Sequence, residues 1–224
     1  MKVISYDSSR LTSLFPFEEV VPLAGANDRE IVESIKAKYD FLTGPDLSKS
    51  EEIAKSGYKF ENGQFSFNSE NFRIANLGIY RDGIVINAQK TDGSEAFLDD
   101  LIAFVREEFS FRDFITEPRR YFQSEIVVEF EHSLNDFIRS FEKIVSVISQ
   151  PLKRIYAIDI PLGLARIDFD VDKTRLATTA PAAIQRFIIE RRIGVAFEKE
   201  RFYSAAPMRT PDHVSVLEEI EKLA

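Results

Sequence analysis

The clearest pattern of apolar and polar positions lies between residues 122 and 172. Successive side chains of a strand point to opposite faces, and residues 125–131 alternate in this way. One face holds only apolar side chains and the other is mostly acidic: Ile126, Val128 and Phe130 against Glu125, Val127, Glu129 and Glu131. We therefore predict a half-buried strand over 122–131.

Residues 133–150 change to a spacing of three and four, which is typical of an amphipathic helix. The apolar positions are Leu134, Phe137, Ile138, Phe141, Val145 and Ile148. Ser133 is suited to cap the first turn, and Pro151 is expected to end the helix because proline cannot continue a helix interior. Two more strands are predicted over 154–172, the second from the alternation in 165–171.

The same two periods predict the remaining elements. Further helices are expected at about 28–41, 94–109 and 211–223, with a short helix opened by a capping box of Ser48 and Glu51. The pairs Asn62-Gly63 and Asp82-Gly83 favour tight turns, so each predicts a hairpin. Additional strands are expected at 2–6, 19–23, 184–196 and 197–205.

These elements indicate an α+β fold with a mainly antiparallel sheet, because hairpin turns outnumber helix crossovers. We expect the helices at about 94–109 and 133–150 to pack on one face of the sheet, with Phe141 buried beneath the second. Residues 1–57 are predicted to form an N-terminal layer or subdomain and 58–224 the sheet domain, or the whole chain one continuous domain. The helix at 211–223 closes the chain.

Composition narrows the class of protein. The chain has 224 residues, is 44% hydrophobic and contains no cysteine, so it can build a sizeable core but has no disulfide or thiolate metal site. No run approaches the eighteen or more apolar residues of a membrane span, and the first residues lack the apolar centre of a signal peptide. We expect a soluble cytoplasmic protein with no membrane partner and no cofactor.

The formal net charge is −8. A basic surface supplies most of the affinity for duplex DNA, so duplex DNA is not expected as a partner. Motifs for phosphate-binding loops and for the serine-hydrolase nucleophile are absent from the sequence. Only two histidines are present, His132 at a strand–helix junction and His213 in the last helix. We expect both to be at least partly solvated, and His132 is the candidate general base.

Acidic side chains gather on two of the predicted strands. Asp168, Asp170 and Asp172 are two residues apart and share one face of a strand, where they would face the same side as the acids of 125–131. Oxygen ligands of this kind suit magnesium or calcium, which makes the three aspartates a candidate metal site. The alternative is a solvated face neutralised by arginines such as Arg186 and Arg192, and this alternative is the one that we expect.

Basic side chains form the complementary set. Arginine forks match phosphate in two-point geometry, so five arginines make a candidate phosphate site. They are Arg119, Arg120, Arg186, Arg191 and Arg192. Cross-strand pairing with the acidic strands is the simpler interpretation.

Three functions follow from these features. The first is a non-catalytic protein-interaction or accessory subunit, adaptor- or immunity-like, of a bacterial or phage system, which binds another protein or itself. The second is a metal-dependent enzyme acting on a phosphate-bearing substrate. The third is a nucleotide or nucleic-acid binder that uses the arginines of 119–120 and 186–209. The absence of a recognisable catalytic set favours the first function and leaves enzymatic activity open.

Overall fold

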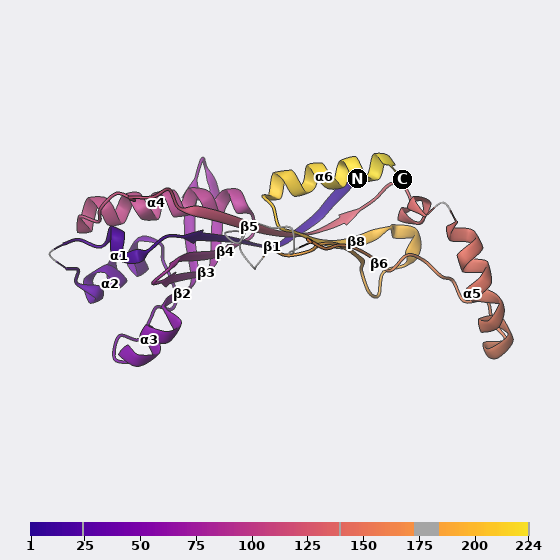
Figure 1. Cartoon of the computed structure of the whole chain (residues 1–224), viewed down its shortest axis with the longest axis horizontal. Coiled ribbons are helices and arrows are strands. Elements are labelled where there is room, and N and C mark those ends of the chain that lie inside the picture. Colours follow the sequence, from indigo (N-terminus) through magenta and orange to yellow (C-terminus); the bar gives the residue numbers. More distant parts are fainter. Residues whose placement is uncertain (24, 139, 173–183, 224) are drawn as a thin grey trace. The chain divides into compact units, whose positions relative to one another are not determined.

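The computed structural model describes residues 1–23, 25–138, 140–172 and 184–223, and the fold is α+β as predicted (Figure 1). The described strands form one eight-stranded sheet in the order β2-β3-β4-β1-β5-β8-β7-β6. They are β1 (Lys2–Leu14), β2 (Tyr58–Phe67), β3 (Glu70–Tyr80), β4 (Gly83–Ala88), β5 (Arg119–Glu129), β6 (Arg166–Phe169), β7 (Phe187–Arg191) and β8 (Arg201–Ala206). The strand pairs β1/β4, β2/β3, β3/β4, β6/β7 and β7/β8 are antiparallel.

Six α-helices and two 3-10 turns are described with these strands. The helices are α1 (Phe17–Val20), α2 (Asp28–Lys38), α3 (Ser50–Ser56), α4 (Thr91–Phe109), α5 (Phe141–Tyr156) and α6 (Thr210–Leu223). The 3-10 turns are η1 (Leu134–Phe137) and η3 (Phe197–Lys199).

The chain divides into two compact units. Unit 1 comprises Met1–Tyr6, Glu125–Pro207 and Pro211–Ala224, and unit 2 comprises Asp7–Ser124 and Met208–Thr210. The strands β1 and β5 therefore contribute residues to both units. The domain boundary expected near residue 57 stays a prediction, and α1, α2 and α3 belong to the same unit as β2, β3 and β4.

Unit 2 is built around a helix on a sheet. The helix α4 buries Phe97, Leu98 and Leu101 against β2 and β4, as the spacing in 94–109 predicted. The helix begins at Thr91, three residues earlier than expected. The Thr91 N–H donates to the Thr210 hydroxyl at 3.1 Å, and the Thr210 N–H donates to the Thr91 hydroxyl at 2.8 Å. Each threonine thus satisfies an orphan donor at the start of the other's helix.

Unit 1 has a core of its own, and α6 covers it. Leu217 of α6 is fully buried, with Val214 and Ile220 packed beside it. They meet apolar side chains of the strands and of η1: Ile126, Val128, Phe130, Leu134, Ile189 and Phe202. The predicted C-terminal helix is confirmed, and this helix occupies the position expected for 133–150.

The predicted helix over 133–150 is wrong in both its bounds and its packing. Ser133 caps only the 3-10 turn η1, with its hydroxyl accepting from the Asn135 N–H at 3.3 Å. After a break, α5 begins at Phe141 and continues through Pro151 to Tyr156. None of its residues is buried, so Phe141 is only half-buried and not in a core. Periodicity had identified an apolar face but not what lies against it.

The two predicted hairpins have different outcomes. The hairpin between β3 and β4 forms as expected, but its turn is Arg81-Asp82 instead of Asp82-Gly83, and Gly83 is the first residue of β4, paired with Tyr80. Asn62 and Gly63, by contrast, lie inside β2, and the turn into β3 falls at Asn68 and Ser69, both with positive φ. Gly63 serves packing instead of turning, because a Cβ there would stand 2.4 Å from the Phe41 ring.

Predicted strands are also corrected in three regions of the chain. Residues 19–23 belong partly to the short helix α1, and 154–156 complete α5, so only Arg166–Phe169 is a strand within 154–172. In the C-terminal region the strands are shorter than expected because η3 and a turn at Gly194, where φ is +78°, interrupt them.

Candidate functional site

The most unusual surface of the described residues is one face of α5. Positions 141, 144, 145, 148, 152 and 155 recur at three and four, so their side chains share one side of the helix. Apolar side chains on or beside this side are strongly exposed: Ile144 47%, Val147 72%, Ile148 45%, Ile155 72% and Tyr156 60%. We call Phe141, Ile144, Val145, Ile148, Leu152 and Ile155 the apolar face of α5. A contiguous apolar patch of this kind is typical of an interaction surface.

Local contacts hold α5 as a helix. The Ile144 N–H donates to the Ser140 carbonyl at 3.0 Å, which starts the hydrogen-bond ladder. At the other end Ala157 adopts a left-handed conformation, and its N–H donates to the Lys153 carbonyl at 2.9 Å. Lys153 also forms an ion pair with Asp159 at 2.8 Å. These contacts close both ends of the helix without covering its apolar face.

Charged side chains of α5 lie away from the apolar face. Glu142, Lys143, Lys153 and Arg154 are all exposed, and three of the four are basic. An amphipathic helix with a basic polar side suits either an acidic protein surface or an anionic lipid surface. The arrangement can bind and orient a partner.

The three aspartates of the candidate metal site lie in and after β6. Asp168 pairs with Arg166 at 2.7 Å, and Asp170 pairs with Arg186 at 3.0 Å, which confirms the expected pairing for Arg186. Asp172 also has an interaction partner. Within the described ranges, no group of three or more histidine, aspartate or glutamate side chains could hold a metal ion. The metal-binding role of these residues stays a prediction.

Arg191, a candidate phosphate ligand, is a buried part of the unit 1 fold. Its guanidinium donates to the carbonyls of Leu164 and Phe197 and to both carboxylate oxygens of Glu200, at 3.0–3.2 Å. The rings of Phe197 and Phe202 stand 4.7 and 4.5 Å from it. Four of its five N–H groups are therefore used within the fold, and the residue holds β7, β8 and η3 together.

The other four candidate arginines are more exposed. Arg120 pairs with Asp99 at 2.8 Å and with Glu95 at 3.8 Å. Arg186 belongs to the Asp170 pair, and both Arg119 and Arg192 have interaction partners. Arg119 and Arg120 lie in unit 2 and the rest in unit 1. A phosphate site on these arginines stays a prediction.

His213 is fully buried, so its predicted solvation is wrong. The Ser204 hydroxyl donates to the Ile188 carbonyl at 2.7 Å, so its oxygen accepts a hydrogen bond from His213 Nε2–H at 2.8 Å. The buried Nδ1 has no hydrogen-bond partner among the described residues. Burial lowers the pKa of His213 to about 4.

This histidine–serine contact is not a catalytic pair. A nucleophilic serine must give its proton to the histidine, whereas Ser204 donates to Ile188 and receives the proton of His213. Both side chains are also fully buried. The exposed His132 keeps its predicted role as a candidate base.

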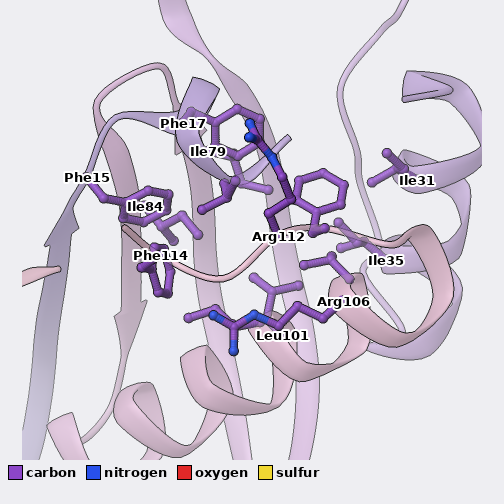
Figure 2. A pocket seen from close by; sticks show the side chains of 14 residues that line it. Phe15, Phe17, Ile31, Ile35, Ile79, Ile84, Leu101, Arg106, Arg112 and Phe114 are labelled. Atoms are coloured by element: carbon purple, nitrogen blue, oxygen red, sulfur yellow. The ribbon is translucent and has the colours of Figure 1, made fainter. Parts of the chain in front are cut away.

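Unit 2 contains a small apolar pocket between α4, α2 and the segment 111–114 (Figure 2). Its volume is about 50 Å³, against roughly 300–1,000 Å³ for typical ligand sites. The guanidinium groups at its margin are engaged: Arg112 donates to the carbonyls of Glu18 and Val21, and Arg106 pairs with Asp113. The pocket is a packing gap of the core.

A wider depression of about 1,010 Å³ opens beside this pocket. Its lining is mixed in polarity, with Tyr58 and Tyr80 among the aromatic side chains and with Arg29, Lys55 and Asp82 among the charged ones. Charges of both signs select no class of ligand, so α5 is the stronger candidate site.

Comparison with models of known protein families and with curated proteins gave no match for this chain. Among the described residues, no helix has the length and apolar content needed to cross a membrane. The function of this chain is therefore inferred from the residues of the site itself.

Sequence analysis missed α5 as a site because it ended the helix at Pro151. The apolar spacing continues beyond that proline through Leu152, Ile155 and Tyr156. A helix over 141–156 places Leu152 and Ile155 on the same face as Phe141, Val145 and Ile148.

Proposed function

We propose that this chain is a non-catalytic protein-interaction subunit that lays the apolar face of α5 into a groove of another protein. The observation that carries the proposal is that the apolar face is complete along a helix of 16 residues, none of which is buried. A helix that presents anchors at i, i+3, i+4 and i+7 is the usual ligand of such grooves. A cytoplasmic location and a bacterial or phage origin form part of the proposal.

Burial of the apolar face supplies the binding energy. Covering the exposed half of an isoleucine side chain contributes roughly 1–1.5 kcal/mol. Ile144, Ile148 and Ile155 together would then contribute about 4 kcal/mol, which corresponds to roughly a thousandfold in Kd. Part of this gain is offset by ordering of side chains at the interface, so about a hundredfold is the effect to expect.

Three features favour a protein partner over an anionic membrane surface. The net charge of −8 opposes attraction of the whole chain to anionic lipid. Only three basic residues lie on α5, and one of them, Lys153, is already paired with Asp159. The β-branched side chains at 144, 145, 148 and 155 are typical of helix-to-helix contacts. The enzyme and the nucleotide binder remain predictions that no feature of the site favours.

The test compares the wild type with two variants of α5. The face variant carries Ile144→Ser, Ile148→Ser and Ile155→Ser, and the control carries Glu142→Ala, Ser146→Ala and Gln150→Ala on the polar side. A protein captured from the cells of origin is purified, and its Kd is measured by calorimetry. We expect the face variant to weaken binding about 100-fold and the control to stay within about twofold.

Three results would contradict the proposal. The first is a captured protein that binds the face variant as tightly as the wild type. The second is co-sedimentation with phosphatidylglycerol vesicles that the face variant loses, which assigns the apolar face to lipid. The third is self-association that the face variant loses in sedimentation velocity, which assigns the apolar face to a second copy. The proposal would be supported if the captured protein protects residues 141–156 of the wild type from hydrogen exchange. The same mixture with the face variant should show no such protection.

A further inference from the structure

The two flanks of α5 differ in charge. Lys143, Val147, Gln150 and Arg154 follow one another at spacings of four, three and four, so they line one side of the apolar face. We call these four residues the basic flank. Glu142, Ser146, Ser149 and Lys153 line the other side with the same spacing, and we call them the neutral flank. The basic flank has two positive charges and no negative charge.

The neutral flank is compensated within the chain. Its one cation, Lys153, pairs with Asp159 at 2.8 Å, and Glu142 adds a negative charge. Lys143 and Arg154 are exposed, and neither forms an ion pair with any described residue. Two uncompensated cations thus stand about 16 Å apart along one flank, since each residue of a helix rises about 1.5 Å.

The apolar face by itself does not define a direction along a groove. Reversing α5 about Ile148 places Phe141 where Ile155 was and Ile144 where Leu152 was. The pattern of large apolar side chains is therefore nearly the same in both directions. The flanks change places in this reversal, so a groove with two unlike walls distinguishes the two orientations.

We propose that the partner's groove has carboxylates along the wall that receives the basic flank, and that Lys143 and Arg154 fix the direction in which α5 lies. This inference rests on the proposed function. In the correct orientation both cations meet the acidic wall. In the reversed orientation Glu142 and the already neutralised Lys153 meet it, which introduces repulsion and removes the attraction. Specificity of binding commonly combines both effects.

The decisive comparison makes one chemical change on each flank. Lys143→Glu and Lys153→Glu alter the net charge equally, and the probe is the partner protein purified in the capture experiment. We expect Lys143→Glu to weaken binding roughly 10-fold or more at 50 mM salt, mainly through a slower association rate, and Lys153→Glu to change it less than about threefold. The difference should shrink at 500 mM salt because screening shortens the reach of exposed charges.

A second measurement reads the direction itself. The chain contains no cysteine, so a spin label attached at Ser140→Cys or at Ile158→Cys reports on one end of α5 at a time. Each label should broaden nuclear magnetic resonance signals at a different end of the partner's groove. With Lys143→Glu and Arg154→Glu combined, the original orientation places two anions against the acidic wall, so the helix should reverse and each label should broaden signals at the opposite end of the groove.

The outcomes separate this inference from the proposed function. If the face variant loses binding while Lys143→Glu and Lys153→Glu behave alike, the interaction through α5 stands and the acidic wall is refuted. Labels that keep the wild-type direction in the variant that combines Lys143→Glu and Arg154→Glu refute it as well. If the face variant binds like the wild type, the proposed function fails and the inference fails with it. Circular dichroism of each variant checks that α5 remains helical.

Discussion

Acid should destabilise this protein through His213. The side chain is fully buried, and its pKa of about 4 lies below the ordinary value of 6.5. Above about pH 6.5 the histidine is neutral in both the folded and the unfolded chain, so it adds no pH dependence. Between about pH 6.5 and 4 His213 binds a proton in the unfolded chain but not in the folded chain. The free energy of unfolding therefore decreases as the pH decreases.

The size of this effect follows from the two pKa values. A difference of one in pKa corresponds to about 1.4 kcal/mol, so the full loss approaches roughly 3 kcal/mol at pH 4. The structural cause is the lack of any described partner for Nδ1, the atom that the extra proton would occupy. Protonation would place a charge in the unit 1 core beside the ring of Phe187, 5.6 Å away.

The assay is urea unfolding from pH 7.5 to pH 4 for the wild type and His213→Phe. Carboxylates titrate in the same range, so the measured quantity is the difference in the free energy of unfolding between the two proteins at each pH. That difference should change by about 3 kcal/mol in favour of His213→Phe as the pH falls. His132→Gln is the matched control because His132 is exposed, and it should retain the wild-type dependence.

A difference that stays constant across this range would refute the burial of a neutral His213. So would a histidine resonance of His213 that titrates near pH 6.5 in the folded protein.

Three further predictions concern stability, each measured by chemical unfolding. Leu217→Ala should cost about 3 kcal/mol because Leu217 is fully buried, whereas Phe141→Ala should cost under about 1 kcal/mol; similar losses would place α5 in a core. Arg191→Met should cost about 3–5 kcal/mol because it removes the cation that pairs with the Glu200 carboxylate and the donor to the Leu164 carbonyl, and a neutral result would contradict the buried network. Gly57→Ala should cost at least about 2 kcal/mol, since a Cβ would meet a carbonyl oxygen at 2.5 Å; Gly194→Ala, with a similar φ and open space, should cost about 1 kcal/mol.

The sequence predicted those parts of the fold in which local pattern and tertiary packing agree. The α+β class, the helix of 94–109 and the helix of 211–223 follow from apolar faces that do meet a sheet. The hairpin between β3 and β4 follows from the turn preference at Asp82-Gly83, although the turn itself lies one residue earlier. In each case one local preference and one burial requirement lead to the same structure.

Prediction failed where a local pattern had more than one physical cause. Glycine at 63 suggested a turn, but it makes room for the Phe41 ring. The apolar face around residue 145 suggested contact with the sheet, but α6 occupies the unit 1 core instead. His213 was expected to be solvated because the sequence does not show that α6 packs against β7 and β8. Ser204 of β8 contacts the His213 ring and donates to the carbonyl of Ile188 in β7.

The candidate site was missed for the same reason. Exposure is a property of the whole fold, so an apolar face that remains uncovered cannot be told from a buried one by spacing alone. The arginines were recognisable as charges, but a partner such as Glu200 for Arg191 lies outside the strand that carries the arginine.

The proline inside α5 has a consequence for how a partner would engage it. Pro151 has no N–H, so the carbonyl of Val147 receives no helical hydrogen bond, and an isolated helix of 16 residues is already marginal in water. The free segment 141–156 should therefore exchange between helix and coil, and docking would select the helical fraction at an entropic cost. Affinity would then be set by the helix–coil equilibrium as well as by contacts. Pro151→Ala should tighten binding while leaving every contact of the apolar face unchanged, which makes this one residue a control on the fraction of the protein that is ready to bind.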